Sequence, residues 1–405
     1  MKNMLKWIAV LTVLVLCFAS AALAEGTEAD PAALYESGMA ALEAGDAKAA
    51  LKDLTEAAKL GSTEADLALA ELYAEGTTVK ADIKKAFTYW LAAAEAGNAE
   101  GQYNTALCYL ENMGVKKAET NAAAAVEYLT AAAELGHGEA ALKLFECALA
   151  GNGMEKDEAF AFACCEKALE AGIDRANLSL GDCYKNGIGT EADPAKAVAC
   201  YNAAAEAGFF EAFSRLGDCA YTGEGMAQDL ETAIGYYQTA ADNGDGCGLA
   251  RMGDLLYNGE GMDADEALAF EYYTMGAEAG CAEAQLGLGN CYMYGKGCER
   301  DVKKAAKVWA AGADLGSGEA MSLTANLFYN GMGVKKDLKK AFSYWLAAAE
   351  AGYTDAYYDV AACYEYGEGV KKNIDQAIYW YGLSAEAGNA LSASLMEGLL
   401  AEKAE

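Results

Sequence analysis

Proline and histidine are almost missing from this 405-residue chain, which holds two prolines and one histidine. Both prolines, Pro31 and Pro194, directly follow an aspartate. This pattern is typical of a helix start, because proline is tolerated at the first helical position. The single histidine, His137, and the adjacent pair Cys164-Cys165 lack the number and spacing of zinc ligands, so the sequence predicts no metal site.

Basic residues are scarce as well, since 30 Lys and Arg stand against 61 Asp and Glu and give a formal net charge of −31. Nucleic-acid binding depends on Lys and Arg that displace counterions from phosphates. The composition therefore excludes a nucleic-acid partner and an anionic membrane surface. Between Leu216 and Gly295 the only basic residue is Arg251, and such a negative region would attract a basic ligand.

Beyond the N-terminus, no stretch approaches the run of about 18 apolar residues that a membrane-spanning helix needs. Residues 1–24 combine two early lysines, an apolar run over residues 8–18 and small residues up to Ala24. This order is typical of a signal peptide. We expect cleavage after Ala24, a periplasmic or secreted location and no membrane span in the mature chain. A lipid anchor at Cys17 is disfavoured, because bulky Leu16 stands where a small residue is required.

Catalytic motifs are missing too. The sequence contains no S-x-x-K, K-T-G or H-E-x-x-H, which mark penicillin-interacting serine enzymes and zinc peptidases. The G-x-G triplets, such as Gly223-Glu224-Gly225, follow expected helices and never a strand, so they are not dinucleotide-binding motifs. The sequence predicts a protein that is not an enzyme and that carries no cofactor.

The chain instead contains an internal sequence repeat. A similar segment ends in glycine every 36 residues, with one exception. The closing glycines are Gly61, Gly97, Gly136, Gly172, Gly208, Gly244, Gly280, Gly316, Gly352 and Gly388. Periodicity of this length indicates an array of supersecondary units that grows by stacking. We therefore expect one elongated array.

Each repeat has the pattern of two helices. In residues 281–316, Ala284 and Leu288 share one helical face, and Gly295-Lys296-Gly297 ends that helix, because glycine adopts positive φ without a Cβ penalty. An Asp or Asn, the residue types that cap helix N-termini, stands where the second helix begins. Alanine follows four residues later in every full repeat, and an aromatic residue usually comes four residues after that. The expected caps are Asp82, Asn121, Asp157, Asp193, Asp229, Asp265, Asp301, Asp337 and Asn373.

These features resemble the Sel1-like repeat family, a relative of the tetratricopeptide repeat. Residues 317–352 show the signature well in Gly331-Met332-Gly333-Val334, the Asp337 cap, Lys340-Ala341, and Ala348 through Gly352. The resemblance covers residues 32–388. It implies an exported bacterial-type member and an all-α fold, a right-handed α/α superhelix (solenoid) of about ten antiparallel helix pairs whose first helices line a concave surface.

The repeats also predict the domain organisation. Residues 25–61 form a shorter, tetratricopeptide-like capping pair and residues 389–405 a capping helix. The repeat over residues 137–172 has Ala148 and Cys165 at its aromatic positions, which predicts looser packing there. The nine repeats between the caps are 62–97, 98–136, 137–172, 173–208, 209–244, 245–280, 281–316, 317–352 and 353–388.

Twelve of the 13 cysteines remain once Cys17 is removed with the signal peptide. Six of them stand eleven residues after a closing glycine, so they are equivalent in stacked repeats and lie too far apart to pair with one another. Two pairs within single repeats are 17 residues apart, and they are candidate disulfides: Cys147 with Cys164, and Cys183 with Cys200. The other cysteines are expected to be small buried residues.

One position on the first helix is the candidate partner-binding surface. Positions four, eight, eleven and twelve after the closing glycine form the buried face, so position ten is expected to point away from it. Position ten carries mainly acids and amides, and position thirteen, its neighbour on the helix, carries tyrosines. An extended peptide needs such polar partners and flat apolar surface, although a simply solvated acidic face has the same pattern. The candidate residues are Glu71, Glu146, Asp182, Asp218, Tyr221, Asp254, Tyr257, Asn290, Asn326 and Tyr329.

The family resemblance implies a non-enzymatic exported scaffold that binds an unidentified protein or peptide, and the charge favours a basic one. Two alternatives stay open. One is an architectural component of the cell envelope. The other is a β-lactamase or penicillin-binding enzyme, as in some cysteine-rich relatives, and the missing motifs argue against it.

Overall fold

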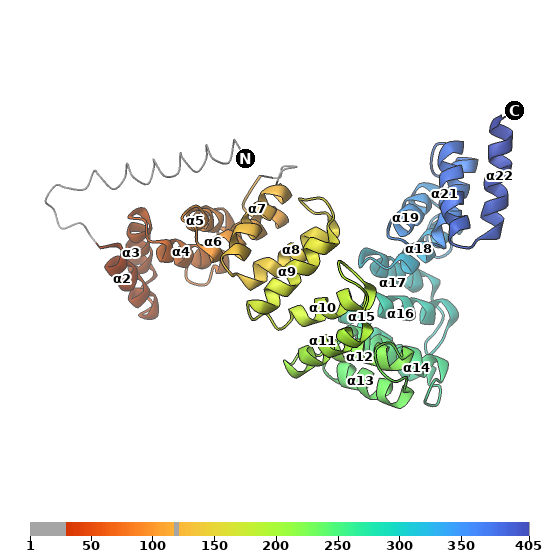
Figure 1. The fold of residues 1–405 in the computed structure, drawn as a ribbon, viewed down its shortest axis with the longest axis horizontal. Helices are drawn as coiled ribbons and strands as arrows, with labels where there is room; N and C mark the ends of the chain where they lie inside the picture. The colour runs from red at the N-terminus through yellow and green to blue at the C-terminus, as the bar shows by residue number, and fades with distance from the viewer. Residues whose placement is uncertain (1–29, 117–120, 405) are drawn as a thin grey trace. The chain divides into compact units, whose positions relative to one another are not determined.

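The computed structural model describes residues 30–116 and 121–404, so the predicted signal peptide lies outside the described residues. The described residues form helices α2 to α22 and no strand (Figure 1). This confirms the all-α prediction. None of these helices is both long enough and apolar enough to cross a bilayer. The chain divides into two units, up to Asp157 and from Glu158 onward, and each is described by itself.

The first unit begins with a pair of helices joined by a short turn, and further pairs follow it. Side-by-side contacts join α2 to α3, α4 to α5 and α6 to α7, and each pair also contacts the next helix along the chain. The unit is therefore a stack of helix pairs. Its helices are α2 (Pro31–Glu43), α3 (Ala47–Lys59), α4 (Thr63–Glu75), α5 (Ile83–Glu95), α6 (Ala99–Glu111), α7 (Asn121–Glu134) and α8 (Gly138–Ala150).

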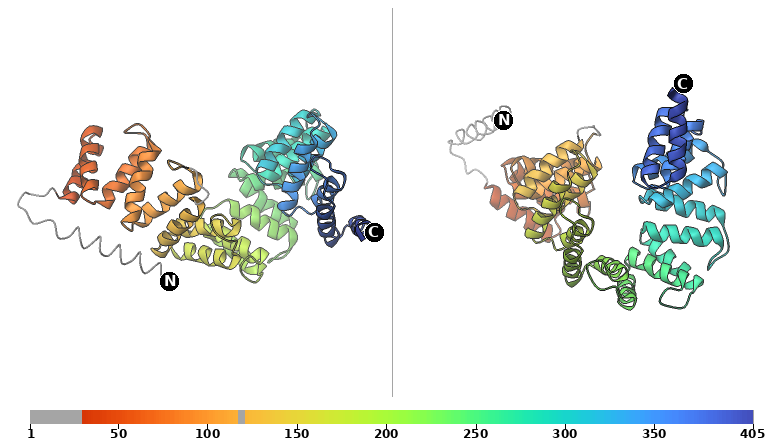
Figure 2. Two further views of the ribbon diagram at one scale, coloured as in Figure 1. Left: turned by 90° about the horizontal axis from the view of Figure 1, so that it is seen from above. Right: turned by 45° about the vertical axis from the view of Figure 1, so that its right-hand side comes forward.

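The second unit continues the same construction, and Figure 2 shows α16 to α21 lying pair upon pair. Its first helices also contact one another directly, α12 with α14, α14 with α16, and α16 with α18. Helices on the inner side of a curved stack lie closest together, so the first helices form the inner face of this unit. The helices are α9 (Glu158–Glu170), α10 (Ala176–Asn186), α11 (Pro194–Glu206), α12 (Glu211–Thr222), α13 (Leu230–Asp242), α14 (Gly246–Asn258), α15 (Glu266–Glu278), α16 (Ala282–Tyr294), α17 (Val302–Asp314), α18 (Gly318–Asn330), α19 (Leu338–Glu350), α20 (Ala356–Tyr366), α21 (Ile374–Glu386) and α22 (Ala390–Ala404).

The division between the units falls between α8 and α9, inside the repeat over residues 137–172. This is the repeat in which Ala148 and Cys165 take the aromatic positions, and both residues are fully buried. Small side chains at these two places leave this repeat without the large rings that fill the other repeats.

Local capping explains where most second helices begin. The side chain of the cap residue accepts a hydrogen bond from a backbone N–H of the first turn, which contributes about 1 kcal/mol per helix. The second helices capped in this way begin after Asp82, Asp193, Asp229, Asp265, Asp301, Asp337 and Asn373. Asn121 differs, because it is the first residue of α7 and its amide donates to Asn112 Oδ1 and to the Lys116 carbonyl. The capping prediction is wrong for Asn121, whose side chain binds the preceding loop instead.

Packing within each repeat follows the alanine and aromatic pattern. Every alanine four residues past the cap position is completely buried, which confirms its role in close helix approach: Ala86, Ala125, Ala161, Ala197, Ala233, Ala269, Ala305, Ala341 and Ala377. The rings four residues further on fill the space between helices. Tyr201 and Tyr381 are fully buried, and Trp309 is 2% exposed. Small and large side chains thus alternate in the core of the repeats.

A half-buried carboxyl in α20, that of Asp359, makes stability depend on pH. Burial, reinforced by repulsion from Asp355, raises the pKa of Asp359 from 3.8 to about 6. The folded state binds this proton more tightly than the unfolded chain, so the stabilisation is complete below the unfolded pKa and is lost as pH rises through about 6. We expect Asp359→Asn to raise the midpoint of urea unfolding at about pH 8 and to match the wild type near pH 4. The exposed Asp314→Asn is the control, and an equal gain from it would contradict this account.

Candidate functional site

The carboxylates expected to be exposed at position ten are engaged within the protein in the middle of the second unit. Each accepts a hydrogen bond from the hydroxyl of the buried tyrosine on the second helix of its own repeat. The pairs are Tyr201 with Asp182 (2.8 Å), Tyr237 with Asp218 (2.8 Å) and Tyr273 with Asp254 (2.7 Å). The prediction of a freely exposed row is wrong for these three residues, because position ten lies at the edge of the interface, within reach of a long ring.

Two arginines join these pairs from one repeat to the next. Arg215 Nε donates to Asp182 Oδ1 at 3.0 Å, and Arg251 Nε donates to Asp218 Oδ1 at 2.9 Å. Arg251 also lies 3.6 Å from an oxygen of Asp254. The result is a chain of tyrosine, aspartate and arginine across α10, α12 and α14, which we call the Tyr-Asp-Arg network.

Burial sets the protonation of this network. Loss of water, and then the negative charge of Asp218, raise the pKa of Tyr237 well above its ordinary range, so this hydroxyl stays protonated and donates. Loss of water also raises the pKa of Asp254, and its contacts with Tyr273 and Arg251 oppose that effect. Arg251 therefore stabilises two neighbouring carboxylates that would otherwise repel each other.

Position thirteen also contacts the next repeat. Tyr221 donates to Glu260 at 2.8 Å, and Tyr329 donates to Glu368 at 2.9 Å. At the equivalent place, the ammonium of Lys296 lies 5.7 Å from the ring centre of Tyr257. The predicted tyrosines are thus fixed in position by neighbours, while Tyr221 keeps 37% of its surface exposed.

Two adjoining hollows lie over α12, α14 and α16. The first has a volume of about 400 Å³, and its lining includes Asp218, Tyr221 and Glu260. The second, of about 360 Å³, includes Tyr257 and Asn290. Arg251, Asp254 and Asn258 line both. The structure therefore brings together five of the predicted residues, Asp218, Tyr221, Asp254, Tyr257 and Asn290, around one acidic surface.

The other predicted residues lie elsewhere. Asn326 and Tyr329 follow on α18, and Asp182 lies on α10 within the Tyr-Asp-Arg network. Glu71 and Glu146 are exposed on α4 and α8 of the first unit, and Glu146 is paired with Lys143 at 2.6 Å. Their role in binding a partner stays a prediction.

Comparison with known protein families identifies the repeat. A family model described as Sel1 repeat matches nine consecutive segments, residues 63–98, 99–137, 138–173, 174–209, 211–245, 248–281, 282–317, 318–353 and 354–389. The chain belongs to the Sel1 repeat family. No curated protein matches it.

Solved structures of Sel1 repeat proteins are similar to this one. A protective antigen of uropathogenic Escherichia coli with an SLR fold is 24% identical over 92% of this chain and 88% of its own, with a TM-score of 0.54. A Sel1 repeat protein from Oxalobacter formigenes is 27% identical over 60% of this chain and 96% of its own, also with a TM-score of 0.54. The first likeness shows the fold alone.

Sequence reasoning missed several residues of this surface, including Arg251, Glu260, Glu283 and Glu319. A signal for the Tyr-Asp-Arg network was present, because the Sel1 repeats vary in a correlated way. Aspartate at position ten occurs with tyrosine at the large core position, as in Asp182 with Tyr201, Asp218 with Tyr237 and Asp254 with Tyr273. Tryptophan there occurs instead with Glu71, Asn290 or Asn326. Comparing positions between repeats would have predicted the pairing.

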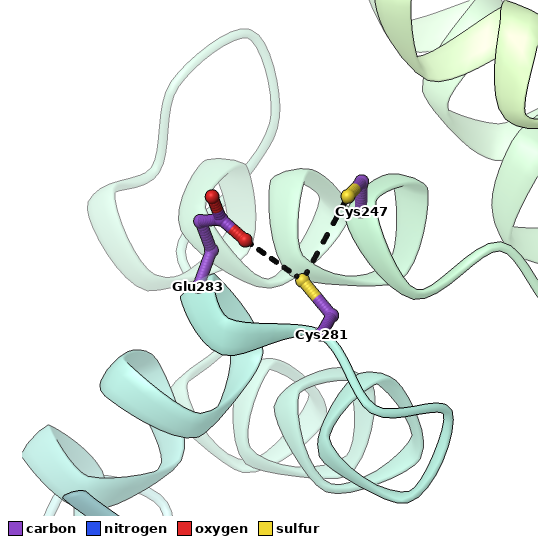
Figure 3. Close-up of side chains that lie close together, drawn as sticks. All are labelled: Cys247, Cys281 and Glu283. Carbon is purple, nitrogen blue, oxygen red and sulfur yellow. Dashed lines mark hydrogen bonds between the residues drawn. The ribbon is translucent and has the colours of Figure 1, made fainter. Parts of the chain in front are cut away.

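The candidate disulfides stay predictions. Cys147 belongs to the first unit and Cys164 to the second. Cys183 and Cys200 are thiols in this structure, and burial raises the pKa of both. Sequence reasoning did not single out another pair, Cys247 and Cys281, whose sulfur atoms lie 3.9 Å apart beside Glu283 (Figure 3).

Proposed function

We propose that this Sel1 repeat protein is a non-enzymatic exported scaffold that binds a basic, extended segment of a partner protein in the two hollows over α12, α14 and α16. Sel1 repeat arrays are typical protein-interaction scaffolds. The observation that carries the proposal is the lining of the hollows. The lining carries more acidic than basic side chains. The basic ones are Lys185 and Arg251, and the acidic ones are Asp218, Asp254, Glu260, Glu283 and Glu319.

We expect these acids to have two different roles. Asp218 and Asp254 are held by tyrosine and arginine, so they maintain the surface. Glu260 and Glu319 come from outside the Tyr-Asp-Arg network and can pair with lysine or arginine of the partner. The exposed Tyr221 and the half-buried Tyr257 line the same hollows, and cations bind well over aromatic rings.

The amide of Asn290 completes the lining of the second hollow. An amide side chain offers both a donor and an acceptor to a peptide backbone. Regularly spaced acids, rings and an amide suit an extended peptide better than a compact small molecule. This supports the peptide-binding scaffold over an architectural role, which needs no such surface.

We expect the double substitution Glu260→Lys with Glu319→Lys to weaken binding of a lysine-rich extended peptide about tenfold or more, or about 1.4 kcal/mol. Fluorescence anisotropy with the labelled peptide and the mature chain measures this. Asp218 and Asp254 are unsuitable positions for this test, because their loss also leaves tyrosine and arginine unpaired. Binding should also weaken as salt is added.

The matched control is Glu206→Lys with Glu350→Lys, which changes the net charge equally at exposed ends of α11 and α19. A glutamate-rich peptide of the same length is the second control. Equal weakening by both double variants would show attraction by net charge alone. Absence of any peptide binding would favour the architectural alternative.

A further inference from the structure

We propose that Cys247, Cys281 and Glu283 form a binding site for a thiophilic divalent metal ion of the zinc class at the edge of the second hollow. This departs from the expectation of no metal site, and it does not depend on peptide binding. The three side chains come from two successive repeats, and Figure 3 shows them turned toward one another.

The separations fit a tetrahedral ion. Cys281 Sγ lies 3.9 Å from Cys247 Sγ and 3.1 Å from Glu283 Oε2. Bonds of about 2.3 Å to sulfur and about 2.0 Å to oxygen place two sulfur ligands about 3.8 Å apart and a sulfur and an oxygen about 3.5 Å apart. The Cys247 sulfur and the Glu283 oxygen lie within 4.8 Å of each other, so side-chain movements of about an ångström would complete the geometry. Three protein ligands leave a fourth position open, and Glu283 itself lines the hollow.

Hydrogen bonds within this cluster are weak. Cys281 approaches both the Cys247 sulfur and the Glu283 carboxylate, and a thiol is a weak donor and a weak acceptor. A cation among the three side chains would replace these weak contacts with three metal–ligand bonds.

Placing Cys281 in this cluster leaves helix α16 without a side-chain cap, which lowers the stability of the helix. Cys281 occupies the N-cap of α16 and makes no capping bond, whereas Asp245 and Ser317 cap α14 and α18 at the equivalent place. Loss of such a cap costs about 1 kcal/mol. Gly246 is also needed, because a Cβ there would lie 2.8 Å from the Cys281 Cβ.

Binding would release protons. Each thiol loses its proton to solvent as it becomes a thiolate ligand, and the metal ion takes the place of the protons without any change of oxidation state. Affinity is therefore expected to fall as pH falls.

Cobalt(II) is the probe that tests this site, because thiolate ligands give it an intense charge-transfer absorption. The mature chain, reduced with a phosphine, should bind one equivalent with this band, and zinc should displace it. Cys247→Ser should abolish the band, and Glu283→Gln should weaken binding by at least the tenfold that loss of an outer-shell partner costs. The control is Cys298→Ser, a half-buried thiol of the same unit outside the cluster.

Three results would overturn the proposal. One is a reduced wild type without the band, and another is a Cys247→Ser variant that binds cobalt like the wild type. The third is a Cys247–Cys281 disulfide that re-forms ahead of metal binding, detected by mass spectrometry. Cys247 is exposed, so its serine variant is expected to fold, and circular dichroism verifies this.

Discussion

Gly297→Ala is expected to destabilise the array by about 3 kcal/mol, whereas Gly316→Ala should cost about 1 kcal/mol. Gly297 has φ +68°, and an added Cβ would lie 1.9 Å from the carbonyl oxygen of Glu266. Glu266 is the first residue of α15 in the preceding repeat. Glycine is thus required at position 297 both by its own backbone and by close contact between repeats.

Gly316 makes the matched comparison. It has φ +93°, but no atom lies within 4 Å of the place where a Cβ would stand. Only the backbone conformation resists alanine there. The closing glycine that defines the repeat in the sequence is therefore less important for stability than the second loop glycine.

Urea unfolding followed by circular dichroism measures both variants. Repeat arrays can unfold in parts, so hydrogen exchange across α15 to α17 should locate the loss. Faster exchange at the start of α15 is expected in Gly297→Ala and not in Gly316→Ala. Equal destabilisation by the two substitutions would show that contact between repeats contributes nothing at this loop.

Asp218→Ala is expected to cost about 2 kcal/mol, because it leaves the buried Tyr237 hydroxyl without an acceptor and Arg251 without its closest ion-pair partner. The ion pair itself adds little, since both side chains are partly exposed. Asn290→Ala, at the same position two repeats further along the chain, is the control. Its expected cost lies within about 0.5 kcal/mol.

A double-mutant cycle with Tyr237→Phe separates the causes. If the tyrosine–aspartate bond carries the effect, the double variant loses about 1 kcal/mol less than the sum of the single variants. Urea unfolding of the four proteins gives this coupling. Additive losses would mean that Asp218 and Tyr237 act independently. The hydrogen bond between them would then contribute nothing to the free energy of unfolding.

The features that the sequence predicted well are local and repeated. An N-cap needs only its own first turn, so Asp301 and Asp337 could be identified without knowledge of the neighbours. Ala233 and Tyr237 follow at helical spacing, and the same order in the other repeats strengthened the interpretation. The exception, Asn121, stands in the one repeat of different length, where the loop before the helix differs.

The candidate site was harder to predict. Helical periodicity gives the direction of a side chain from its own axis, but it says nothing of how far a neighbouring ring extends. Tyr237 reaches past the buried face to Asp218, and Arg251 reaches back from the following repeat. Cys247 and Cys281 are 34 residues apart, a separation that no short metal-binding motif contains.

By itself, the sequence determined the helices and the residues buried between them, because both depend on contacts within one repeating unit. Only the tertiary structure decided which acids stay available on the inner face and which are bound, and that two cysteines meet a glutamate. Those outcomes depend on side chains of successive repeats, whose distances are fixed by stacking and not by position along the chain.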